Sequence, residues 1–242
     1  MESFGRNRIA YIGALYLDGQ PSETGAVYDG TAKISLGDTN GKSIPWIERG
    51  GKYAALRSVL SNISWTDLDE NYLTYGSRIT IDGEEFFCRL PRLGSNAKEP
   101  NEWETFFAEM SPVEKGFFVA DFYSWGLDTP GDPAYRVVRH KEGMAGWGRE
   151  LKCKRQPVFD WRPVLEPILP ALSSIQKGTR IRVRFKDGSM LIDGKLEGYS
   201  DYDILLGICG PISSGSAWCK TVQPGLVAVD RAGVSRVTPL RF

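Results

Sequence analysis

The sequence has few of the side chains from which metal and catalytic sites are usually built. It contains a single histidine, His140, and only four cysteines, which are Cys88, Cys153, Cys209 and Cys219. The cysteines form no CxxC pair and show no metal-ligand spacing, so a zinc site or a Ser-His-Asp triad would have to include His140. We therefore expect no metal, no cofactor and no catalytic residues.

Long hydrophobic runs are also lacking. No apolar stretch approaches the ~20 residues that a helix needs to cross a bilayer, and residues 1–10 are polar and charged, unlike a secretion signal. We expect no membrane insertion and a location in a cytoplasm, where the thiols stay reduced.

A net charge is lacking as well, because thirty basic and thirty acidic side chains cancel. No overall field therefore draws the chain onto nucleic acid or a membrane. The charges are unevenly spread, since residues 65–109 hold ten acids and four bases while residues 136–155 hold seven bases and two acids. Such asymmetry either orients a partner or marks two solvated faces of one domain.

Glycine and aromatic residues are plentiful, with 27 Gly, ten Tyr and seven Trp, a mixture that favours short strands and tight turns. The Asp82-Gly83 pair predicts a hairpin over residues 78–90. Helical spacing of apolar residues predicts one helix over residues 53–63 and another over residues 100–110, with Asn101 as the N-cap of the second. The expected fold class is α+β.

A second, smaller domain is predicted to follow the first. Residues 173–178 are polar and end in glycine, which is typical of a linker. Five β-rich runs between residues 179 and 237 have the number and size of the strands of an SH3-like barrel. The predicted organisation is one domain over residues 1–172 and a small β-barrel over residues 177–242.

Three phrases of the first domain resemble a known family. They are Asn101-Glu102-Trp103, then Tyr123-Ser124-Trp125-Gly126 with Tyr135-Arg136-Val137-Val138-Arg139, and last Phe159-Asp160-Trp161-Arg162-Pro163-Val164-Leu165-Glu166. Together they resemble the C-type-lectin-like proteins of phages, prophages and gut bacteria. That family includes targets of diversity-generating retroelements and is related in fold to formylglycine-generating enzymes. This chain departs from the family pattern at two places. The closing phrase of the family has Gly-Phe where this chain has Asp160-Trp161, and the stretch that is variable and rich in Asn and Tyr in the family is basic and Gly-rich in this chain. The chain is therefore expected to be a member of the scaffold whose sequence is not diversified.

The resemblance implies a non-enzymatic binding protein, encoded by a phage or prophage, that displays a basic and aromatic ligand surface. Carried over by position, the ligand-binding residues are Trp125, Asp128, Arg139, His140, Lys141, Trp147, Arg149, Lys152 and Arg155. Aromatic and arginine side chains often dominate binding energy, although the sequence favours core positions for Trp125, Tyr135 and Trp161, because aromatic side chains bury the most area. The implied partner is a host protein or a surface glycan, and the implied location is the cytoplasm of the producing bacterium or the virion.

The second domain resembles an Sm-like barrel. The matching phrases are Gly194-Lys195-Leu196-Glu197-Gly198-Tyr199, Asp203-Ile204-Leu205-Leu206 and, more loosely, Arg231-Ala232-Gly233-Val234. The base-contacting Asn of that family has no counterpart, and Ala232 splits its Arg-Gly pair. Alternation of Arg180, Arg182 and Arg184 is typical of the solvent face of a half-buried strand, so nucleic acid is not an expected partner.

Other functions stay open at this point. The missing signal peptide and the extra barrel favour an intracellular phage protein that inhibits a host defence complex by protein–protein binding. The two domains also fit a structural component of a virion. An enzyme related to the formylglycine generators would need a reactive cysteine pair, for which Cys88 and Cys153 are the candidates. Glu99-Pro100-Asn101 matches the Ca²⁺ and sugar motif of mannose-type lectins, but the accompanying Trp-Asn-Asp is lacking and Pro and Asn are ordinary at a helix start.

Overall fold

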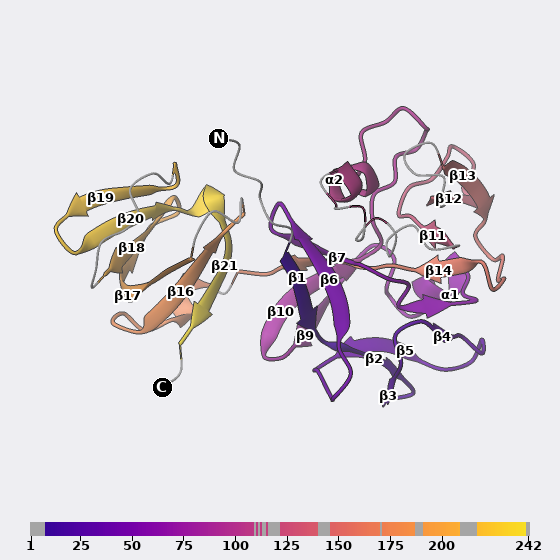
Figure 1. The fold of residues 1–242 in the computed structure, drawn as a ribbon, viewed down its shortest axis with the longest axis horizontal. Coiled ribbons are helices and arrows are strands. Elements are labelled where there is room, and N and C mark those ends of the chain that lie inside the picture. The colour runs from indigo at the N-terminus through magenta and orange to yellow at the C-terminus, as the bar shows by residue number, and fades with distance from the viewer. Residues whose placement is uncertain are drawn as a thin grey trace. The chain divides into compact units, whose positions relative to one another are not determined.

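The computed structural model describes residues 8–108, 110, 112, 115, 122–139, 146–169, 171–186, 191–208 and 217–240. Strands account for 47% of the residues and helices for only 10%, so the fold is all-β and the α+β class predicted from sequence is wrong. The chain divides into two compact units (Figure 1), one built from residues 8–49 and 53–166 and the other mainly from residues 167–240.

Among its described residues, the first unit contains three sheets. Sheet A has the strand order β1 (Arg8–Ile12), β6 (Ile44–Arg49), β7 (Lys52–Ala55), β15 (Val164–Pro167), β10 (Glu84–Arg89) and β9 (Ser77–Ile81). Sheet B has the order β3 (Gln20–Ser22), β2 (Ala14–Leu17) and β5 (Ile34–Gly37). Sheet C has the order β13 (Trp147–Leu151), β12 (Tyr135–Arg139), β11 (Tyr123–Trp125), β14 (Phe159–Trp161), β8 (Leu60–Ser61) and β4 (Ala26–Val27).

Two short helices lie in the same unit, α1 (Trp65–Glu70) and α2 (Glu102–Ala108). Helix α2 confirms the prediction for residues 100–110, and the side-chain oxygen of Asn101 accepts a hydrogen bond from the backbone of Glu104 at 2.9 Å, as an N-cap does. Helix α1 was not predicted. It begins with a capping box, in which Ser64 and Asp67 each accept a hydrogen bond from the other's backbone N–H.

The helix predicted over residues 53–63 is wrong, because this segment forms β7 and β8. β7 pairs with β15, while β8 lies between β14 and β4. Residues 53–56 and 58–61 are all buried, so the strands show nearly continuous apolar character instead of alternation. A short apolar run of this kind cannot be distinguished from a buried helix by periodicity alone.

The hairpin predicted over residues 78–90 is confirmed as β9 and β10. Asp82 and Gly83 both have positive φ, at 51° and 78°. These angles match the type I′ turn, which Asp-Gly favours because its twist agrees with that of the flanking strands.

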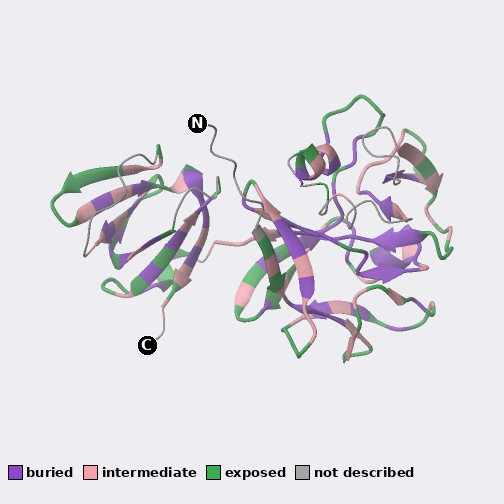
Figure 2. Ribbon diagram, in the orientation of Figure 1, coloured by how far each residue is buried: buried purple, intermediate pink, exposed green. Residues whose placement is uncertain are grey.

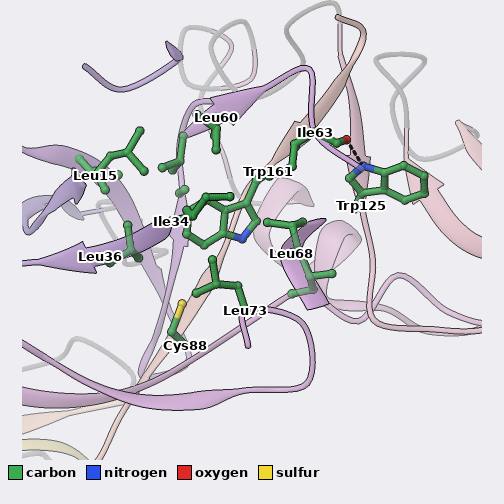
Figure 3. Packing of buried hydrophobic residues seen from close by; sticks show 14 of the residues in the cluster. Leu15, Ile34, Leu36, Leu60, Ile63, Leu68, Leu73, Cys88, Trp125 and Trp161 are labelled. Atoms are coloured by element: carbon green, nitrogen blue, oxygen red, sulfur yellow. Dashed lines mark hydrogen bonds between the residues drawn. The ribbon is translucent and has the colours of Figure 1, made fainter. Parts of the chain in front are cut away.

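Buried residues run through the strands of the first unit (Figure 2), and leucine and tryptophan side chains are prominent in its core (Figure 3). Trp161 lies among Leu60, Leu68 and Leu73 in this cluster, and the indole nitrogen of Trp125 donates a hydrogen bond to the Ile63 carbonyl at 2.8 Å. Trp161 therefore anchors the closing strand β14 in the core, and the Trp125 hydrogen bond ties β11 to the residues that follow β8.

The second unit is one antiparallel sheet, sheet D, with its own core. Its strand order is β19 (Cys219–Gln223), β20 (Leu226–Asp230), β18 (Asp203–Gly207), β17 (Leu191–Tyr199), β16 (Arg180–Phe185) and β21 (Val234–Pro239). Short 3₁₀ helices lie at Leu172–Ser174 and Arg231–Gly233. Leu172 and Ile175 pack into the sheet D core. β16 alternates arginines, which are exposed or, for Arg184, half-exposed, with buried Ile181, Val183 and Phe185, as expected for a half-buried strand.

No helix among the described residues is long and apolar enough to cross a membrane.

Candidate functional site

The ligand-binding residues predicted from sequence gather around one end of sheet C. Trp125 ends β11, Arg139 ends β12, Trp147 and Arg149 belong to β13, and Lys152 and Arg155 follow it. His140 and Lys141 lie outside the residues that the structure describes.

Trp125 and Arg139 are fully buried. Trp125 stacks on Phe159 with ring centroids 4.9 Å apart. Arg139 forms an ion pair with Glu104 of α2 at 3.5 Å and donates to the Leu93 carbonyl at 3.2 Å. Burial lowers the pKa of Arg139, and Glu104 opposes that shift. Arg139 therefore holds α2 and the 93–94 loop against sheet C, whereas Trp125 is part of the core.

Asp128 and Trp147 are half-buried and fasten the same loop. The Asp128 carboxylate accepts hydrogen bonds from the backbone N–H groups of Leu93 and Gly94, the second at 3.1 Å. The Trp147 indole donates to the Gly94 carbonyl at 3.0 Å.

Arg155 is partly exposed, but its positive charge is paired with a carboxylate of the same unit. It donates two hydrogen bonds to Asp67 of α1, one of them at 3.0 Å, and lies 5.5 Å from the centroid of the Tyr28 ring. Gly30, at φ 95°, has the Arg155 guanidinium where a Cβ would stand. These hydrogen bonds raise the pKa of Arg155. In the same way Lys154 is paired with Glu150 at 2.8 Å.

Arg149 and Lys152 differ from these neighbours. Arg149 is exposed, Lys152 is half-exposed, and neither has an ion-pair partner among the described residues. The Arg149 guanidinium lies 5.5 Å from the centroid of the Tyr135 ring. The backbone of Lys152 is anchored, because its N–H donates to Ala134 and its carbonyl accepts from Thr66 of α1.

Two apolar residues that the sequence did not indicate complete this surface. Tyr135 is half-exposed and pairs in register with Leu151, which is 44% exposed. Sequence favoured a core position for Tyr135, and only the pairing of β12 with β13 places it beside Leu151. We call Tyr135, Arg149, Leu151 and Lys152 the β13 surface.

The scaffold beneath the β13 surface is held by buried charges of the closing phrase. Asp160 accepts hydrogen bonds from Ser124 and from Arg162, and all three side chains are at least 97% buried. Arg89 is buried between Glu102 of α2 and Glu166 of β15. Breaking such buried pairs is costly, so they fix the relative positions of α2 and the sheets.

The motifs considered for metal binding and catalysis have structural roles in this fold. Glu99 accepts hydrogen bonds from the backbone and hydroxyl of Ser95, and Asn101 caps α2. Within the described residues, no three His, Cys, Asp or Glu side chains are grouped as a metal site. Cys88 is buried, and burial raises its pKa to about 12, whereas Cys153 is exposed.

Comparison with known proteins gives no relative from which a function could be transferred. No family model, no curated protein and no solved structure matches the chain.

Proposed function

We propose that the chain is a non-enzymatic binding protein whose ligand surface is the β13 surface, and that its partner is an acidic protein or a glycan-bearing one. The resemblance of its phrases to phage C-type-lectin-like proteins, and hence to their scaffold, also supports this role. Of the residues expected to bind ligand, Arg149 and Lys152 are the ones proposed to contact the partner. The buried residues of that set are proposed to hold the strands in place.

The observation that carries the proposal is the difference in pairing among neighbouring bases. Lys154 and Arg155 are neutralised by Glu150 and Asp67, whereas Arg149 and Lys152 have no ionic partner among the described residues. Arg149 lies on the same face of sheet C as the half-exposed Tyr135 and the exposed Leu151, and Lys152 follows at the end of β13, so this edge combines positive charge with apolar surface. Arg and Tyr are enriched at the energetic centres of interfaces, and unpaired charge steers an oppositely charged partner.

Rigidity of the support is a second argument. An interface residue gains most when it is ordered before binding, because less conformational entropy is then lost. β13 pairs along its whole length with β12, and Lys152 is fixed to α1 through its backbone. The exposed side chains are therefore presented from an ordered backbone.

Charge reversal tests the proposal. The purified wild type and the variant R149E/K152E are each offered cleared lysate and envelope fractions of a bacterial host, and captured molecules are quantified by mass spectrometry. We expect a partner that the wild type enriches and the variant loses. The control K33E/K98E makes the same change in net charge at two exposed lysines outside the β13 surface, and it should retain the partner.

The identity of the captured partner separates the alternatives. An envelope protein or surface glycan agrees with a receptor-binding role, and a cytoplasmic nuclease or effector would favour inhibition of a host defence complex. Equal capture by the wild type and R149E/K152E would rule out the β13 surface.

A further inference from the structure

A groove lies at the β1 end of sheet A, away from the residues used so far. It has a volume of about 620 Å³, within the ~300–1,000 Å³ typical of ligand sites. Ile9 and Tyr11 of β1 line it together with Pro45 of β6, Leu56 and Phe122, and residues 23–25 and 57–58 complete its walls. The lining is mixed, because these five apolar side chains are matched by the polar or charged Glu23, Thr24, Ser43, Arg57 and Ser58, so the groove can hold apolar groups next to polar ones.

β1 is an edge strand, and its register shows which of its backbone groups face outward. Tyr11 stands opposite Pro45 and Ile9 opposite Ile47. Pro45 has no N–H to donate, and its carbonyl accepts from Leu56 at 2.8 Å instead of from β1. Tyr11 and Pro45 are therefore a non-hydrogen-bonded pair of the antiparallel ladder, in which the backbone groups of both residues point away from each other.

The alternation extends along β1. Ile44 donates to the Gly13 carbonyl at 3.0 Å, which agrees with Ile44 facing β1 and Pro45 facing away. Ile9 lies two residues before Tyr11, so its N–H and carbonyl also point out of the sheet. Among the described residues, no strand pairs with this side of β1.

Within the described part of the chain, the outward-facing positions of β1 carry no lysine, proline or bulge. Its two outward-bonding residues are Ile9 and Tyr11, and their side chains are 37% and 65% exposed. Natural edge strands are commonly blunted by Lys, Pro or a bulge. Among the described residues, the outward N–H and C=O groups of Ile9 and Tyr11 have no hydrogen-bond partner, and both side chains line the groove.

We propose that this edge binds an extended peptide segment of a partner protein, which adds a strand to sheet A next to β1. The unpaired backbone groups specify the occupant, because only another extended chain offers donors and acceptors at the same spacing. Side chains of the added strand that share the face of Ile9 and Tyr11 enter the groove, so apolar residues are selected at alternate positions. This site is independent of the β13 surface.

The test uses a proline at an outward-facing position. Ile9→Pro removes an N–H that does not bond to β6, and edge strands accept proline there, so the fold is retained. Ala10→Pro removes an N–H that faces β6 and should lower the melting temperature clearly more than Ile9→Pro. A comparable loss in both variants would overturn the assigned direction of the β1 backbone.

The probe is a phage-displayed library of linear peptides selected on the full chain, with affinities of recovered peptides measured by fluorescence polarisation. We expect peptides with apolar residues at alternate positions that bind Ile9→Pro at least about tenfold more weakly than the wild type. R149E/K152E should bind them unchanged. Failure to enrich any peptide, or equal binding by Ile9→Pro, would overturn the proposal. So would a concentration-dependent dimer that Ile9→Pro abolishes, because the edge would then pair with a second copy.

Discussion

Asp67 joins helix α1 to the turn that follows β13, because it accepts hydrogen bonds from both Ser64 and Arg155. Burial acts to raise the pKa of this carboxyl, but the hydrogen bonds outweigh it and hold the pKa below 3.8. A carboxyl whose pKa is lower in the folded state stabilises the fold above its unfolded pKa. That contribution is lost as the pH falls through the lowered value.

We predict that Asp67→Asn lowers the free energy of unfolding by about 2 kcal/mol at neutral pH, the cost of losing charge-assisted hydrogen bonds at a buried site. The difference between wild type and variant should narrow as the pH falls below 3.8. Urea unfolding followed by tryptophan fluorescence over a pH series measures both quantities. A difference that stays constant with pH would show that the Asp67 charge does not act as described.

Tyr72 occupies a backbone conformation that usually belongs to glycine. It follows the C-terminus of α1 with φ at 60°, Leu73 donates back to the Leu68 carbonyl as in a Schellman motif, and the Tyr72 ring is 79% exposed. A side chain in this left-handed conformation costs about 1–2 kcal/mol.

Tyr72→Gly should therefore stabilise the first unit by about 1 kcal/mol, partly offset by the flexibility of glycine in the unfolded chain. Tyr72→Phe keeps the same backbone cost and should leave stability unchanged. Thermal melting of the three proteins compares them directly, and a destabilised Tyr72→Gly would mean that the ring makes a stabilising contact.

At this scale the sequence indicates the chemistry of the candidate site but not its pairing. The excess of bases between residues 136 and 155 is visible in the chain. Lys154 is neutralised by Glu150, four residues away in the chain. Arg155 and Arg139 are instead neutralised by Asp67 and by Glu104 of α2, which are distant in the sequence, and such contacts have no local signal. Arg139 and Arg149 look alike in sequence, yet one is buried and the other exposed.

At the scale of elements, the register of β1 makes a prediction that needs no ligand. Ala10 and Ile12 face β6, while Ile9 and Tyr11 face outward, so amide protection should alternate along the strand. Hydrogen exchange read residue by residue by NMR should find the Ile9 and Tyr11 amides fast and the Ala10 and Ile12 amides slow. Uniform protection of all four amides would contradict the free edge.

Elements with strong local signals could be predicted, and those defined by distant pairing could not. The Asp82-Gly83 turn and the Asn101 cap specify the 77–89 hairpin and α2 through contacts within a few residues. β7 and β8 are defined by β15 and β14, which lie about 100 residues later in the chain. The capping box of Ser64 and Asp67 is a local signal for α1, and no helix was predicted from it.

At the scale of the molecule, the incorrect prediction of a helix over residues 53–63 contributed to the incorrect fold class. With residues 53–63 assigned to strands, the two described helices α1 and α2 have six and seven residues, and the sheets form nearly all of the framework. Buried ion pairs of the closing phrase then tie this framework together, and Arg149 and Lys152, which have no ion-pair partner among the described residues, lie at the edge of sheet C.

The most direct test of the account is the affinity of the captured partner for three proteins, namely the wild type, R149E/K152E and K33E/K98E. If the β13 surface binds the partner through its unpaired charges, R149E/K152E should bind at least about tenfold more weakly at constant salt, mainly through slower association. K33E/K98E should bind like the wild type. Equal affinity of all three proteins, with R149E/K152E folded, would contradict the central claim.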